Sequence, residues 1–254
     1  MIERRDQEGI RTLTLVRPEK RNALDLAGLG KLAAEIAAAG TDPGVRVLVL
    51  TGTGTVFCSG LDLGSMGETP REPMLERVLI DDVLTPLANL PIPTIAAMNG
   101  HAYAGGLELA LHCDIRIAVA SARMAMPVAR LGIVVPYPLL QKLVEVVGSA
   151  VTAELLFSGA AIESERALVV GLVNHVVRAE RLWSETEEMA TAIAANAPLA
   201  IRAMKLALIA SRSVRERTPS AAVKEAFDTA RGSADAEEGL RAVAEKRAPR
   251  FSGR

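Results

Sequence analysis

The residues best suited to chemistry lie in one short stretch, 99–114, which reads NGHAYAGGLELALHCD. Gly105 and Gly106 stand where an apolar run gives way to a helical pattern, so unpaired backbone N–H groups should point out of a helix N-terminus. Glu108 falls in the first turn of that helix and projects near the same opening. The same residues also suit a plain turn, because the helix dipole favours a glutamate there whatever its role. The stretch therefore predicts a donor for developing negative charge beside a carboxyl group, provided that the rest of the chain supports a site.

The elements that would position this stretch repeat along the chain. Apolar runs at 45–50, 94–98 and 115–120 predict buried strands, and a glycine-bearing corner follows each of the first two. A helix is expected over 105–112. This strand–corner–strand–helix order predicts an α/β fold, a coiled stack of ββα units. No strand is followed by G-x-G-x-x-G and no G-x-x-x-x-G-K-S/T occurs, which excludes the common nucleotide-binding motifs.

The remaining elements follow from apolar periodicity and turn residues. Strands are expected over 9–17 and 172–177, a surface loop over 64–73, and helices over 26–40 with Asp25 as N-cap, then 74–90, 139–147, 150–157, 163–170, 182–195, 198–211, 219–230 and 236–246. We expect two parts, a catalytic core over 1–195 and a helical region over 196–254. The helical region has an Ala/Leu/Met face that needs a partner, which favours an oligomer.

The composition bounds the class of protein. Half of the 254 residues are hydrophobic but only 3% are aromatic, so the core must be aliphatic. A net charge of −1 gives no basic field for nucleic acid and no polybasic run for a membrane surface. No apolar stretch approaches the roughly 20 residues that span a bilayer. Cys58 and Cys113 have no metal-ligand spacing and are expected to be small buried residues in a reducing compartment, the cytoplasm.

Five motifs, in order, resemble those of the crotonase superfamily, also called the enoyl-CoA hydratase/isomerase family. They are KRNAL at 20–24, FCSGLDL at 57–63, NGHAYAGGLELALHCDI at 99–115, GLVNHVV at 171–177 and EKRAPRF at 245–251. The resemblance covers essentially the whole chain. It implies a spiral ββα core, a C-terminal region that packs a homotrimer or a dimer of trimers, and an acyl-CoA substrate with no separate cofactor and no metal.

The resemblance also implies roles for particular residues. The backbone N–H groups of Leu61 and Gly105 would stabilise a thioester enolate, with Glu108 as the acid/base; a preorganised donor of this kind is worth about 3 kcal/mol in the transition state. Coenzyme A would contact Arg21, Ala23, Ser59, Leu61 and Lys246. Without the resemblance, Arg21 and Lys246 would be taken as solvated surface charges.

One position departs from the family pattern. Hydratases of the family carry a second glutamate directly after a proline, and here Val128 follows Pro127. Valine can neither give nor accept a proton, whereas hydration uses one carboxyl to activate water and another to protonate carbon. Glu108 would then act alone, in slow hydration or in a double-bond shift.

Two other functions stay open. The segment from Pro127 to Tyr137 is similar to methylmalonyl-CoA decarboxylases, in which a tyrosine hydroxyl lies near the departing carboxylate. The spacing is longer here, and those enzymes have a histidine at the position of Leu61. The other alternative is an acyl-CoA-binding protein without turnover, against which the retained Glu108 argues, because a bare carboxylate opposes burial.

Two further side-chain sets were weighed. His101, seven residues before Glu108, is a candidate for the pocket rim or a partly buried structural residue. A Ser59–His101–Asp114 hydrolase lacks the G-x-S-x-G elbow and is not favoured. Asp62 and Asp114 are expected to bind backbone amides.

Overall fold

The computed structural model describes residues 2–62, 74–131, 135–211 and 249–254, with single residues between 221 and 247. The loop expected over 64–73 lies outside these residues. The helices expected over 219–230 and 236–246 lie largely outside them.

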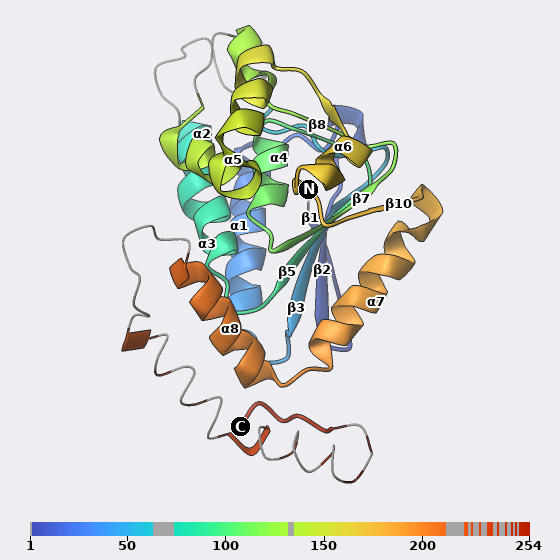
Figure 1. The fold of residues 1–254 in the computed structure, drawn as a ribbon, viewed down its shortest axis with the longest axis vertical. Helices are drawn as coiled ribbons and strands as arrows, with labels where there is room; N and C mark the ends of the chain where they lie inside the picture. Colours follow the sequence, from blue (N-terminus) through green and yellow to red (C-terminus); the bar gives the residue numbers. More distant parts are fainter. Residues whose placement is uncertain are drawn as a thin grey trace.

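Two sheets form the centre of the molecule (Figure 1). The larger sheet has the strand order β1-β2-β3-β5-β7-β10, with β1 Ile2–Gln7, β2 Ile10–Leu15, β3 Val47–Gly52, β5 Thr94–Met98, β7 Ile115–Val119 and β10 His175–Val177. The smaller sheet has the order β4-β6-β8-β9, with β4 Val56–Cys58, β6 His101–Tyr103, β8 Arg123–Ala125 and β9 Ile162–Glu163. Each repeat thus places one strand in the larger sheet and its short second strand in the smaller sheet, which confirms the predicted spiral of ββα units.

Helices cover both faces of the larger sheet. α7 (Leu182–Ala194) lies on one face, and α1 (Leu26–Thr41) lies with α3 (Thr85–Ala88) on the other (Figure 1). The remaining helical elements are η1 Pro18–Lys20, α2 Met74–Val78, η3 Leu79–Leu84, α4 Gly105–Leu111, η4 Pro127–Leu131, α5 Tyr137–Ser158, α6 Ser164–Val169, η5 Ala179–Arg181 and α8 Pro198–Ser211. Asp25 caps α1 as expected, since its Oδ1 accepts a hydrogen bond from Gly28 N at 2.8 Å.

The two helices expected over 139–147 and 150–157 are confirmed: they make up α5, and non-helical backbone at Gly148, whose φ is +74°, separates them. Two other expectations need correction. The helix expected over 74–90 is interrupted by a π-helical turn, η3, between α2 and α3. The strand β1 was not expected, because its residues after Ile2 are polar and exposed; antiparallel pairing with β2 fixes it at the sheet edge.

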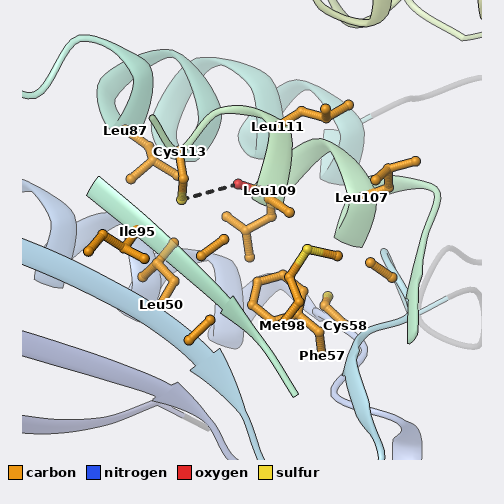
Figure 2. Packing of buried hydrophobic residues seen from close by; sticks show 14 of the residues in the cluster. Leu50, Phe57, Cys58, Leu87, Ile95, Met98, Leu107, Leu109, Leu111 and Cys113 are labelled. Carbon is orange, nitrogen blue, oxygen red and sulfur yellow. Dashed lines mark hydrogen bonds between the residues drawn. The ribbon is translucent and has the colours of Figure 1, made fainter. Parts of the chain in front are cut away.

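The core holds α4 tightly. Leu107, Leu109 and Leu111 are fully buried, and Figure 2 shows Leu109 between α4 and the residues of β5. A Cβ atom added to Gly106 would lie 2.1 Å from the carbonyl oxygen of Cys58, so only glycine permits this close approach. Cys58 and Cys113 are buried free thiols, as predicted. The helix that carries Glu108 is therefore a rigid part of the fold.

The C-terminal helix α8 is joined to this core by a buried ion pair. The Lys205 ammonium contacts the carboxylate of Asp114, just after α4. Arg46, before β3, donates to Ala194 O at 2.8 Å and to Phe251 O at 3.3 Å. Among the helices that the structure describes, none alone has the length and apolar character to cross a bilayer; α7 and α8 reach it only together, across a bend of 105°.

Candidate active site

Two backbone amides from distant parts of the chain lie close together. Leu24 N donates to Gly60 O at 2.8 Å and Asp62 N donates to Leu24 O at 2.9 Å, which leaves the Leu61 N–H out of this ladder. Within the described ranges, neither the Leu61 nor the Gly105 N–H donates to a backbone group. A Cβ atom on Gly60 would lie 3.0 Å from Gly105 N, and one on Gly105 would lie 3.7 Å from Leu61 N. Two N–H groups this close together can both donate hydrogen bonds to one anionic oxygen.

The bend before Gly105 is made by a strained alanine. Ala104 has φ +47° and ψ −121°, a conformation that a residue with a Cβ atom rarely adopts. Its carbonyl oxygen accepts the hydrogen bond from Glu108 N at 3.0 Å. The sequence suggested a flexible, glycine-bearing corner at this point, whereas the structure has a fixed alanine corner. Gly60, before Leu61, has φ +95° and does need glycine.

Glu108 is fully buried, and its surroundings give its carboxyl group little support. Neither Oε1 nor Oε2 has a hydrogen-bond partner among the residues that the structure describes. Burial raises the pKa of Glu108 well above its ordinary value, and the positive charge of Lys142 opposes that rise. A carboxyl group with a raised pKa keeps its proton to higher pH, which suits it for proton transfer near neutrality.

His112 is a neighbour of Glu108 that the sequence analysis missed. Its Nδ1 lies 2.7 Å from Glu108 O and 3.8 Å from Glu108 Oε2. The signal was present, because side chains four residues apart on a helix are neighbours.

Arg21 and Ser59 come together. Ser59 N donates to Arg21 O at 3.1 Å, which ties the first motif to the β4 bend that carries Leu61. The Arg21 side chain is exposed and its φ is +54°, while Ala23 is half-buried. Lys246 lies outside the described residues.

Asn22 holds this arrangement and was not singled out from the sequence. Its side chain is 1% exposed. Nδ2 donates to Val56 O at 2.7 Å and to Thr53 O at 2.9 Å, and Oδ1 accepts from Arg17 N at 2.9 Å. An amide can satisfy all of these partners at once, so Asn22 fixes the segment that contains Arg21 and Ala23.

The three candidate pocket residues lie on different elements. His101 is in β6 and its Nδ1 accepts a hydrogen bond from Arg123 N at 3.1 Å. Val128 is in η4, half-buried and packed against the core. Tyr137 begins α5 and is 69% exposed. In the described part of the chain, no hydrogen bond joins any of them to the Glu108 carboxyl oxygens.

The aspartates have structural partners. Asp114 accepts from Thr94 N at 2.9 Å, which confirms its predicted amide contact, and it also pairs with Lys205. Asp62 pairs with the guanidinium of Arg17 at 2.9 Å. Asp114 is bound by Thr94 and Lys205, and His101 is bound by Arg123. The structure therefore does not support a Ser59–His101–Asp114 hydrolase. No group of three or more His, Cys, Asp or Glu side chains able to hold a metal ion occurs in the described ranges.

Comparison with known proteins gives a consistent result. Residues 5–254 match the family model described as enoyl-CoA hydratase/isomerase. The chain is 35% identical to the 2,3-dehydroadipyl-CoA hydratase of Escherichia coli over 98% of this chain and 97% of that protein. It is 33% identical to the mitochondrial methylglutaconyl-CoA hydratase of Mus musculus over 98% of this chain and 81% of that protein. The solved enoyl-CoA hydratase of Bacillus anthracis is similar with a TM-score of 0.93 and 32% identity, covering 100% and 99% of the two chains.

Proposed function

The chain belongs to the enoyl-CoA hydratase/isomerase family, the crotonase superfamily, and from this premise we propose that it converts enoyl-CoA thioesters through an enolate held by the Leu61 and Gly105 amides. Glu108 is the group that gives or takes the proton. The observation that carries the proposal is the closeness of two amides, from bends far apart in the sequence, that donate to no backbone group among the described residues.

The physical case rests on preorganisation. An enolate oxygen develops negative charge, and donors already fixed in place stabilise it without reorganising; each such donor is worth about 3 kcal/mol. The strained Ala104 and the buried α4 hold Gly105, and the Leu24 ladder holds Leu61. These contacts support the proposed oxyanion hole.

Glu108 is suited to move a proton between substrate carbons. Its burial favours the protonated form and raises its pKa, so Glu108 can hold a proton to higher pH than an exposed glutamate. Val128, at the position of the second family glutamate, offers no proton. A double-bond shift needs only one such group, whereas hydration also needs a positioned water, so we expect isomerisation to suffer less than hydration.

The ligand would be an acyl-CoA. We propose that Arg21, Ala23, Ser59 and Leu61 border the coenzyme A arm, with Lys246 as a phosphate contact and a homotrimer or a dimer of trimers as the assembly. The two hydratase relatives are named for thioesters whose acyl chain carries a free carboxylate. Dehydroadipyl-CoA and methylglutaconyl-CoA therefore belong beside crotonyl-CoA and a 3-enoyl-CoA in the first assays.

The deciding experiment compares the wild type with Glu108→Gln on these thioesters. Loss of the acid/base should lower kcat by about 10²–10⁴-fold. Glu165→Gln, an exposed glutamate on α6, is the matched control and should behave as the wild type. Equal turnover by the wild type and Glu108→Gln contradicts the proposal.

Two other outcomes identify the alternatives. Bicarbonate release from a malonyl-type thioester, lost in Tyr137→Phe, would indicate a decarboxylase. Tight acyl-CoA binding without turnover of any thioester would indicate a binding protein. Either result contradicts the proposed acid/base role of Glu108.

A further inference from the structure

One turn of helix separates two titratable side chains, the buried Glu108 and the half-buried His112. The Glu108 side chain is 1% exposed and the His112 side chain is 11% exposed. His112 Nδ1 lies 3.8 Å from Glu108 Oε2 and 2.7 Å from Glu108 O. Neither carboxyl oxygen has a hydrogen-bond partner in the described part of the chain.

The hydrogen bond to the main chain fixes which ring nitrogen carries a proton. A carbonyl oxygen only accepts, so Nδ1 must be the donor to Glu108 O. That N–H is held beside the carboxyl group whatever the charge of the ring. When the second ring nitrogen is also protonated, a positive charge stands about 4 Å from the carboxylate, where interaction is strong in a buried site.

The other charges around α4 are few. Among the described elements, β4, β6, η3 and α5 pack against it. α5 contributes Lys142, which is buried, bonded to Glu145 Oε1 at 3.0 Å, and close enough to affect Glu108. The other titratable groups on these elements are Tyr137, Glu145 and Glu154 on α5, Cys58 on β4, whose pKa burial raises to about 12, His101 and Tyr103 on β6, and the exposed Asp81 and Asp82 on η3.

We propose that His112 is a positioning residue for Glu108, and that the imidazole and the carboxyl group titrate as one coupled pair in which the charge of the ring sets when Glu108 releases its proton. The proposal rests on the proposed function, in which Glu108 is the acid/base. A buried carboxyl group without donors ionises only if a nearby positive charge compensates it. His112 supplies a charge that can be switched by pH, and Lys142 supplies a constant one.

The pair can be observed without turnover. The chain has only three histidines, so ring-labelled protein gives three signals by NMR. The titration of His112, assigned by its loss in His112→Asn, should move to lower pH by about 1 unit in Glu108→Gln, because the negative neighbour is removed. The exposed His175 of β10 serves as the internal control and should not move. A His112 signal that titrates identically in both proteins, or in neither, overturns the proposal.

Activity gives the second readout. His112→Asn keeps an N–H that can donate to Glu108 O, whereas His112→Ala removes it, and both remove the charge. Without that charge Glu108 ionises at higher pH, so the acid limb of the kcat/KM profile should move up by about 1 unit in both variants, with KM little changed. A normal profile in His112→Asn with a defect only in His112→Ala would show a purely structural role and overturn the proposal. His175→Asn should match the wild type.

The two readouts separate this inference from the proposed function. If the enzyme turns over no enoyl-CoA but the His112 titration still depends on Glu108, the pair exists and the proposed reaction is wrong. If Glu108→Gln abolishes turnover and the His112 titration does not change, the reaction stands and the coupling is wrong.

Discussion

The two acids at either end of α4 have opposite environments. At the N-terminal end, Glu108 is fully buried and neither of its oxygens has a partner among the described residues. Just past the C-terminal end, Asp114 accepts from Thr94 N at 2.9 Å, from Thr94 Oγ1 at 3.0 Å and from Lys205. One carboxyl group is fully used by the fold, and the other is buried at a cost and left available.

The backbone shows the same asymmetry. Ala104, before α4, has a positive φ, and the Gly105 N–H has no backbone acceptor in the described chain. His112, after α4, has ordinary helical angles. Strain and unsatisfied polar groups are therefore concentrated at the end of the helix where the chemistry is proposed, which is where such costs are usually tolerated.

Removing a partner of Asp114, at the C-terminal end of α4, should have the largest effect on stability. Lys205→Met leaves the half-buried Asp114 without its cation, and loss of one partner of a largely buried ion pair costs up to about 3 kcal/mol. Urea unfolding measures this loss. The double variant with Asp114→Asn should recover much of it, since no unpaired charge remains. A change below about 1 kcal/mol for Lys205→Met would mean that the pair is screened like an exposed one.

A change beside the N-terminal end of α4, where the Gly105 amide lies, should affect catalysis and not stability. Gly60→Ala places a Cβ atom 3.0 Å from Gly105 N at a residue with φ +95°, so one or both amides must move. Loss of one donor predicts a decrease in kcat of about 10²-fold, or about 3 kcal/mol. Gly54→Ala, also at positive φ but with Pro18 as its nearest neighbour, controls for backbone strain. A wild-type kcat in Gly60→Ala would remove these amides from the mechanism.

The pH dependence of stability distinguishes the two acids. Burial raises the folded-state pKa of Glu108 above its unfolded value, so the folded protein binds this proton more tightly. The resulting stabilisation is full below the unfolded pKa and is lost as pH rises toward the folded pKa. Glu108→Gln removes this loss, so its stability should rise relative to that of the wild type between pH 5 and pH 8. Chemical unfolding at both pH values tests it, and a pH-independent difference is the contrary result.

The smallest effect is expected at the strained corner. Ala104→Gly relieves a positive φ that costs about 1–3 kcal/mol and adds about 0.4–1 kcal/mol of unfolded-state entropy, so the variant should be more stable by about 1 kcal/mol. Its kcat should fall a few-fold, because the Gly105 amide is held less firmly. Thermal unfolding with single-turnover kinetics measures both, and a less stable variant would show that the corner is not strained.

Local patterns in the sequence predicted much of this molecule. The helix α8 begins where its pattern indicates, and the alternation of strands predicted the ββα spiral. Glu108 was found because its helix follows a strand and a glycine pair. These features depend on residues that are neighbours in the chain.

What the sequence did not reveal depends on contacts between distant residues. The closeness of the Leu61 and Gly105 amides was expected only from the family resemblance, because it requires β4 to pair with β6. Asn22 is a functional support only because Val56 and Thr53 bring their carbonyl groups to it. The short second strands have too few residues to show an alternation. His112 could have been identified from the sequence, because it lies only four residues after Glu108 on the same helix face.

The most direct test is a crystal structure with an enoyl-CoA thioester or a stable enolate mimic bound. We expect the thioester oxygen to lie about 3 Å from both Leu61 N and Gly105 N, with a Glu108 carboxyl oxygen facing the adjacent acyl carbon. A thioester oxygen that contacts neither amide, or a ligand bound away from Glu108, would contradict the account.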